Sequence, residues 1–89
     1  MRKKIIEKRK GRIYLVNAST DMYLTKRELD CARHIIKGKT IAATAQEVGL
    51  STRTVEFYIN KMKKRFGANK KHELIGRLIE LGVLKELYG

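Results

Sequence analysis

Four glycines divide most of this 89-residue chain into short segments with the residue pattern of helices. Each follows a run of apolar residues at helical spacing and can take the left-handed conformation that ends a helix. These glycines are Gly38, Gly49, Gly67 and Gly82. Thr25, Thr40 and Ser51 stand before the first three segments, and their hydroxyls can cap helix N-termini. The pattern predicts four helices separated by tight turns.

The first helix has the strongest start signal. Thr25 and Glu28 have the spacing of a capping box, and Leu24 and Leu29 that of a hydrophobic staple. The second helix is predicted over residues 40–48, the third over about 52–66 and the fourth over about 70–81. Before them, residues 1–11 are basic and predict an arm. Residues 12–16 and 22–24 are β-prone runs that flank turn formers, so a short β-hairpin fits there.

The fold class expected from these signals is all-α. Residues 24–89 form a four-helix domain, and residues 1–23 form a basic arm or linker with the short hairpin before the first helix. The second and third helices are joined by Gly49-Leu50-Ser51, and a short turn that contains Gly is typical of a helix-turn-helix motif. Ala45 is small where the two helices must approach closely.

The charge of the chain is strongly basic and clustered. Lys and Arg number 21 and Asp and Glu number 9, which gives a net charge of +12. Residues 1–12 and residues 51–71 each hold seven basic residues and one acidic residue. Clustering of this kind favours a polyanionic partner over a merely soluble surface.

The sequence lacks the residue patterns that are typical of metal sites, enzymes and membrane proteins. The single Cys31 cannot form an internal disulfide or a cysteine-rich zinc site, and His34 and His72 lack partners at metal-ligand spacing. No catalytic triad, carboxylate pair or phosphate-binding loop is recognisable, so we expect neither an enzyme nor a cofactor. No uncharged run approaches the about 20 residues that span a bilayer, and no secretory signal is visible. We therefore expect a cytoplasmic protein without a membrane partner.

The third helix has two contrasting faces. Its apolar face is formed by Val55, Ile59, Met62 and Phe66, and its opposite face by Arg53, Glu56, Phe57, Asn60 and Lys64. Asn60 can pair with adenine, Arg53 can read guanine or hold a phosphate, and Glu56 can accept from cytosine N4. For Phe57 two interpretations stay open: contact with thymine methyl groups, or packing of a partly exposed ring on the first helix.

From Leu24 to about Leu84 the sequence resembles the DNA-binding domain of LuxR/NarL/GerE-type transcription regulators. The resemblance rests on several short motifs in order: Leu24-Thr25 with Arg27-Glu28, Gly38, Ala45, Leu50-Ser51, Thr54-Val55 and Gly67. It implies a four-helix domain whose third helix enters the major groove. The implied base contacts are Glu56, Phe57 and Asn60, and the implied phosphate contacts are Thr40, Ser51, Thr54 and Lys61. We add Arg53 to the first set and Lys64 to the second.

This sequence departs from the family pattern at several positions. Glu56 stands where Lys is common, and Arg65 and Phe66 replace a common Lys-Leu pair. Thr44 takes a usually aliphatic core position, where its hydroxyl can bond back to a helix carbonyl. These departures affect the expected sequence preference and leave the expected fold intact.

The fourth helix has more apolar residues than one core face requires. We expect a weak two-fold homodimer through Leu74, Leu78, Ile79 and Leu81, with a monomer that has a wide apolar stripe as the alternative. The expected function is sequence-specific binding of double-stranded DNA in transcription regulation, with RNA polymerase as a candidate second partner. An RNA-binding basic domain and a promoter-recognition domain of the sigma-factor type are the alternatives.

Overall fold

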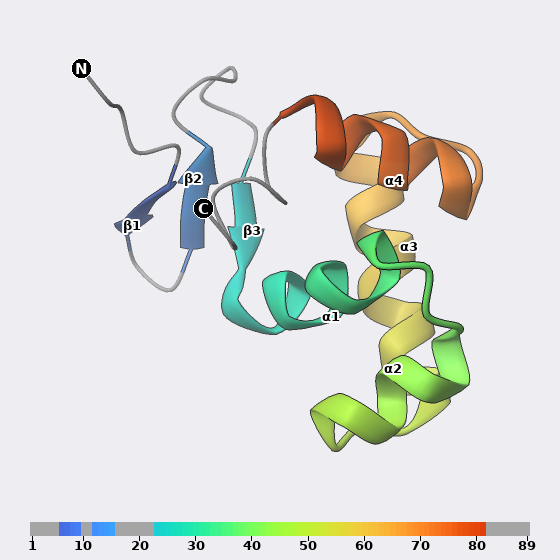
Figure 1. Cartoon of the computed structure of the whole chain (residues 1–89). Coiled ribbons are helices and arrows are strands. Elements are labelled where there is room, and N and C mark those ends of the chain that lie inside the picture. Colours follow the sequence, from blue (N-terminus) through green and yellow to red (C-terminus); the bar gives the residue numbers. More distant parts are fainter. Residues whose placement is uncertain (1–5, 10–11, 16–22, 82–89) are drawn as a thin grey trace.

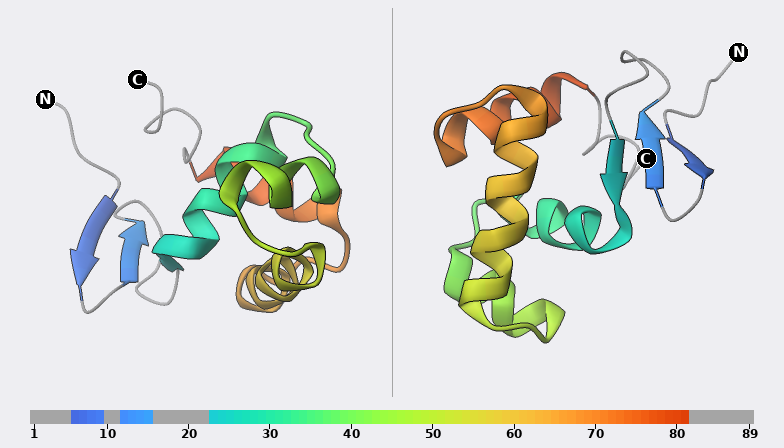
Figure 2. Two further views of the ribbon diagram at one scale, coloured as in Figure 1. Left: turned by 90° about the horizontal axis from the view of Figure 1, so that it is seen from below. Right: turned by 180° about the vertical axis from the view of Figure 1, so that it is seen from behind.

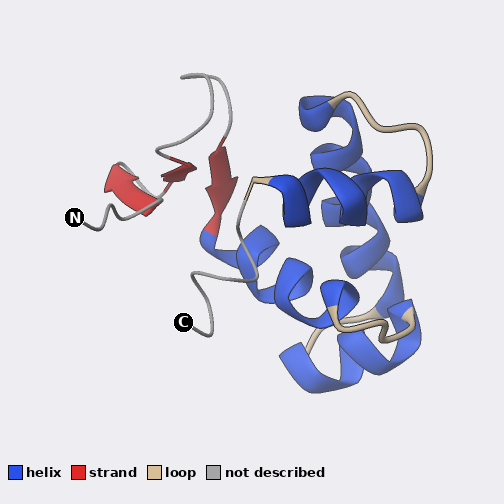
Figure 3. Cartoon of the chain, turned by 45° about the horizontal axis from the view of Figure 1, so that its top comes forward, coloured by secondary structure: helices blue, strands red, loops and turns tan. Residues whose placement is uncertain are grey.

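The computed structural model describes residues 6–9, 12–15 and 23–81. These residues form four helices, as predicted: α1 (Lys26–Ile36), α2 (Ile41–Val48), α3 (Thr52–Phe66) and α4 (Lys71–Glu80). They also form three short strands, β1 (Ile6–Arg9), β2 (Arg12–Leu15) and β3 (Tyr23–Thr25). The strands lie to one side of the helices, and β3 leads directly into α1 (Figures 1 and 3).

The helix starts have the caps that the sequence predicts. The hydroxyl of Thr25 accepts the Glu28 amide at 3.2 Å, and the Glu28 carboxylate accepts the Thr25 amide at 3.0 Å, which completes a capping box. Thr40 and Ser51 cap α2 and α3 in the same way, each through its side-chain oxygen. The predicted end of the fourth helix at Gly82 lies outside the described residues.

The strands pair antiparallel in the order β1-β2-β3 within the described segments. Ile13 pairs with Leu24, so the predicted hairpin is confirmed, while its turn formers at 17–21 lie outside the described residues. Strand β1 was not predicted, because residues 6–9 have the composition of the basic arm. Three of its four residues are charged and have low strand propensity, so its conformation depends on pairing with β2. The rest of the arm lies outside the described residues.

The hydrophobic core lies where α1, α3 and α4 meet. Its buried residues are Leu24, Cys31, Ala32, Ile35, Ala45, Val55, Ile59, Met62, Phe66, Ala68, Leu74 and Leu78. Helix α3 is the longest element, with α2 packed near its start and α4 near its end (Figure 2). Cys31 is fully buried, and burial raises the pKa of its thiol to about 11. None of the helices in the described part of the chain could cross a membrane.

Thr44 differs from its predicted environment. Its side chain is fully buried, as expected for the core position, but its hydroxyl has no hydrogen-bond partner among the described residues. The expected bond back to a helix carbonyl is therefore wrong. A buried hydroxyl without a partner costs about 1–3 kcal/mol of desolvation free energy.

Candidate nucleic-acid interface

The turn between α2 and α3 sets the direction of α3. Gly49 ends α2 in the left-handed conformation, with φ at 73°, which a side chain would disfavour. The next amide, that of Leu50, donates to the Ala45 carbonyl at 2.9 Å. Ser51 then starts α3 at once as its N-cap. The three-residue turn therefore leaves little freedom between the two helices, and their packing matches a helix-turn-helix.

Helix α3 buries one face and exposes the other. Val55, Ile59, Met62 and Phe66 are buried. The structure exposes all the predicted outward residues of this helix, Arg53, Glu56, Phe57, Asn60 and Lys64, and also the predicted phosphate contact Lys61. This face is about the width of one helix, and a B-DNA major groove of about 12 Å admits a helix. The arrangement can therefore place several donors and acceptors against base edges together.

Phe57 is the apolar residue of this exposed face. Its side chain is 56% exposed, which fits an outward ring better than a ring packed on α1. The ring lies edge-on to Tyr58, with centroids 5.6 Å apart, and the Lys61 ammonium is 5.3 Å from its centre. These contacts fix an exposed apolar surface next to a cation.

Three predicted phosphate contacts are hydroxyls at helix starts. Thr40 and Ser51 accept backbone amides from Ala43 and Thr54, so both oxygens are already used as caps. The Ser51 hydroxyl also donates to the Thr54 hydroxyl at 2.9 Å. Among the residues that the structure describes, the hydroxyl protons of Thr40 and Thr54 have no acceptor, whereas the proton of Ser51 is engaged.

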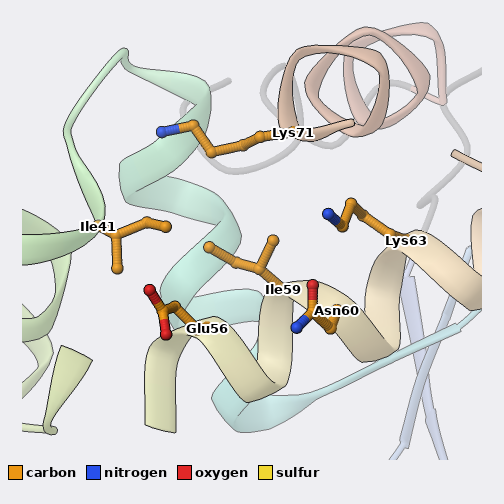
Figure 4. A pocket seen from close by; sticks show the side chains of 6 residues that line it. All are labelled: Ile41, Glu56, Ile59, Asn60, Lys63 and Lys71. Carbon is orange, nitrogen blue, oxygen red and sulfur yellow. The ribbon is translucent and has the colours of Figure 1, made fainter. Parts of the chain in front are cut away.

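A cavity of about 250 Å³ opens beside α3, between the start of α2 and the start of α4. Its lining residues are Ile41, Glu56, Ile59, Asn60, Lys63 and Lys71 (Figure 4). We call it the lysine cavity. Sequence reasoning missed both lysines. Lys63 could have been found from its helical spacing to Asn60, whereas the position of Lys71 depends on how the chain turns after α3.

That turn is fixed by hydrogen bonds. Gly67 ends α3 with φ at 69°, in the left-handed conformation. The Arg77 guanidinium then donates to the carbonyls of Phe66 and Gly67, which holds α4 against the end of α3. The backbone amide of Asn69 donates to the Glu73 carboxylate at 2.8 Å, and this bond holds the pKa of Glu73 below its ordinary value.

The end of α3 is also attached to the start of α1. Arg65 donates through both guanidinium nitrogens to the carboxylate of Glu28, one of them at 3.1 Å. It also donates to the Tyr23 carbonyl at 3.2 Å, and its guanidinium lies 4.1 Å from the centre of the Tyr23 ring. Because Glu28 is also part of the capping box, one buried carboxylate joins β3, α1 and α3.

The prediction for α4 needs correction. Leu74 and Leu78 are fully buried in the core, so they cannot also form a dimer surface. Leu81 is half-buried against the core, and Ile79 is 47% exposed. The core therefore uses the leucine stripe of α4, while Ile75 is half-buried against the core and Ile79 lies at the surface. Within the described residues no cluster of three or more His, Cys, Asp or Glu side chains could hold a metal ion.

The sequence profile of the luxR family of bacterial regulatory proteins (GerE) matches residues 22–78. This chain belongs to that family. It therefore carries a helix-turn-helix DNA-binding domain of transcription regulators and is not an enzyme. The expected fold and family are both confirmed.

Curated relatives include the transcriptional activator protein AnoR of Acinetobacter nosocomialis, which is 36% identical over 64 residues. This match covers 72% of the chain and 27% of AnoR. The transcriptional activator protein AhyR of Aeromonas hydrophila is 30% identical over 61 residues, which are 68% of the chain and 24% of AhyR. The LuxR-family domain thus spans about a quarter of the length of these relatives.

Solved structures with the same fold include two VqmA proteins. The phage VqmA in complex with DPO is 34% identical, with a TM-score of 0.66 over 68% of this chain and 28% of that protein. The Vibrio cholerae VqmA dimer in the absence of target DNA is 29% identical, with a TM-score of 0.69 over 89% of this chain and 34% of that protein. The latter is described as a LuxR-type receptor.

Proposed function

We propose that this LuxR-family domain binds double-stranded DNA sequence-specifically and regulates transcription, with α3 in the major groove. The observation that carries the proposal is the mixed exposed face of α3, which combines a guanidinium, a carboxylate, an amide and an aromatic ring. Each of these groups has a matching base edge or thymine methyl group in the major groove. A surface that only maintained solubility would not need an exposed aromatic ring among these groups.

The proposed roles follow from chemistry. Arg53, Glu56, Phe57 and Asn60 contact bases. Thr40, Ser51, Thr54, Lys61 and Lys64 contact phosphates. The free protons of Thr40 and Thr54 suit them to donate to phosphate oxygens, whereas Ser51 acts mainly by ordering the start of α3. The proposed domain boundaries are residues 24–89. The regulator acts in the bacterial cytoplasm at the nucleoid, and RNA polymerase is its proposed second partner.

The test compares two neighbouring residues of α3. A preferred site is first selected from a random duplex library, and affinities are measured for that site and for each single-base variant. Asn60→Ala should lose about 1–3 kcal/mol of discrimination at one base pair. Lys61→Ala should weaken binding to all sequences about equally and lower the salt dependence by about one phosphate contact. Equal losses on specific and non-specific DNA in both variants would show that Asn60 does not read a base.

Structured RNA serves as the competitor in the same assay. If RNA displaces the domain from its selected DNA site as well as unlabelled duplex of the same length does, the proposal of a DNA regulator fails in favour of an RNA-binding domain. We expect duplex DNA to be the stronger competitor, because α3 fits the wide major groove of B-DNA and not the narrow one of RNA.

We also propose a weak homodimer through the face of α4 that holds Ile75, Gly76 and Ile79. Ile79 is 47% exposed, Ile75 is half-buried, and between them a β-carbon added to Gly76 would meet no heavy atom within 4 Å. A second copy could therefore pack closely there. Two recognition helices about one DNA turn (~34 Å) apart would bind an inverted repeat.

Ile79→Glu should abolish cooperative binding to the repeat and leave half-site affinity unchanged. Unchanged cooperativity would exclude this interface.

A further inference from the structure

We propose that the lysine cavity seats one phosphate of the DNA backbone, held by the ammonium groups of Lys63 and Lys71. This inference rests on the proposed function and adds a binding site that reaches from the recognition helix to α4. The cavity opens at the surface, measures about 250 Å³ and is lined on one side by Glu56 and Asn60 of the exposed α3 face.

The two lysines reach the cavity from different helices. Lys63 follows Asn60 by three residues and Ile59 by four, so all three share one side of α3. Lys71 stands in the first turn of α4, where Arg77 holds the chain against the end of α3. Both side chains extend toward the cavity, and Glu56 and Asn60 project into it from α3 (Figure 4).

The cavity lysines are without counter-ions in the described part of the chain. The ion pairs within residues 23–81 are Arg65 with Glu28 and Lys39 with Glu47. The lining residue with an acidic side chain is Glu56, which has no ion pair in this region either. Both cavity lysines are half-buried, so part of each stem is already ordered by packing. Two lysine ammonium groups line the cavity against the single carboxylate of Glu56, so its net charge is positive and suits an oxyanion such as phosphate.

The position of the cavity on α3 indicates the source of that phosphate. At about 100° per residue, Lys61 lies about 100° to one side of Asn60 and Lys63 about 60° to the other side. A helix in the major groove has one sugar-phosphate strand along each of its flanks. Lys61 therefore faces one strand, and the cavity lysines face the other. Phosphate contacts on both flanks would fix the rotation of α3 about its own axis and so direct Asn60 toward a single base.

Salt dependence provides the first test. The double variant Lys63→Gln/Lys71→Gln, made in the full chain, should reduce the slope of log affinity against log salt by about 0.9, which corresponds to one phosphate, and each single variant should reduce it by less. The control is Lys26→Gln, which removes the same charge from the exposed start of α1 next to β3 and should leave the slope unchanged. Circular dichroism confirms that each variant is folded. If the cavity variants change the slope no more than Lys26→Gln does, the proposal is overturned.

A second test identifies the phosphate. Single methylphosphonates, which remove one backbone charge, are placed in turn along both strands of the selected site. At one position the methylphosphonate should weaken wild-type binding several-fold and have little effect on the binding of Lys63→Gln. That position should lie on one strand, and the position at which the methylphosphonate has little effect on Lys61→Ala should lie on the other. Identical profiles for wild type and Lys63→Gln would refute the cavity contact. A normal discrimination loss in Asn60→Ala beside that result would leave the proposed function standing.

Free anions are the alternative occupant. In two-dimensional NMR spectra, inorganic phosphate should shift the Lys63 and Lys71 resonances only weakly in the millimolar range. Saturation by micromolar phosphate with an unchanged DNA salt slope would show a free-phosphate site instead and would overturn the assignment to the DNA backbone.

Discussion

Replacing Arg65 with methionine should destabilise the domain by about 3–5 kcal/mol, because it leaves a buried carboxylate without its counter-charge. Glu28 has a side chain that is 1% exposed, whereas that of Arg65 is 13% exposed. Removal of the guanidinium takes away two hydrogen bonds to this carboxylate and leaves one from the Thr25 amide. Stability of about 0.05–0.15 kcal/mol per residue gives a chain of this length about 4–13 kcal/mol in total. The variant is therefore expected to be close to unfolding.

The opposite replacement should cost less. In Glu28→Gln the side-chain oxygen still accepts the Thr25 amide, since glutamine also serves in capping boxes. Arg65 keeps its bond to the Tyr23 carbonyl and can reach solvent with the rest of its guanidinium. We expect a loss of about 1–2 kcal/mol. The double variant Glu28→Gln/Arg65→Met no longer buries an unpaired charge, so it should be more stable than Arg65→Met alone by about 2 kcal/mol.

The assay is urea denaturation of all four proteins, followed by circular dichroism at 222 nm and analysed as a double-mutant cycle. A cost below about 1 kcal/mol for Arg65→Met, or a double variant less stable than Arg65→Met, would refute the reasoning. Either outcome would mean that the Glu28 carboxylate finds water in place of its partner.

Three further predictions concern single residues. Thr44→Val should stabilise the domain by about 1 kcal/mol because it removes a buried hydroxyl without a partner, whereas Thr40→Val should destabilise it by about 1 kcal/mol because α2 loses its cap. Urea denaturation that gave both changes in the free energy of unfolding the same sign would contradict this pair of predictions. Glu56→Gln should tighten binding to non-specific DNA at low salt, because a carboxylate near the DNA backbone repels its phosphates. Fluorescence anisotropy that showed no gain in affinity would place Glu56 away from the DNA backbone. The pKa of the Cys31 thiol is 9.0 in the unfolded chain and about 11 in the folded one, so the stability that the thiol contributes is present below pH 9 and is lost as the pH rises toward 11. Cys31→Ala should therefore flatten the dependence of the free energy of unfolding on pH between 9 and 11, and an equally steep curve would contradict the assignment.

Local signals predicted the helices and the reading face well. The cap hydroxyls of Thr25, Thr40 and Ser51 and the turn glycines act within a few residues, so the sequence displays them directly. The outward face of α3 follows from helical spacing, since its four buried residues are large and apolar. Arg65 was noted only as a departure from the family pattern, and its pairing with Glu28 was not predicted.

Features that depend on distant contacts could not be predicted. The two apolar stripes of α4 have the same spacing, and only packing against α1 and α3 decides that Leu74 and Leu78 are buried while Ile79 stays outside. Strand β1 depends on pairing with β2, and Lys71 reaches the lysine cavity only because of the turn at Gly67. In each case the deciding partner is on another element.

The central claim, that α3 reads base edges in the major groove, is tested most directly by removing one acceptor there. Adenines of the selected site are replaced one at a time by 7-deazaadenine, which lacks the N7 acceptor and still pairs with thymine. One position should weaken wild-type binding by at least about five-fold, which corresponds to about 1 kcal/mol, and should have no effect on Asn60→Ala. Wild-type binding that tolerates the replacement at every adenine, or an equal loss in both proteins at every sensitive position, would contradict the claim.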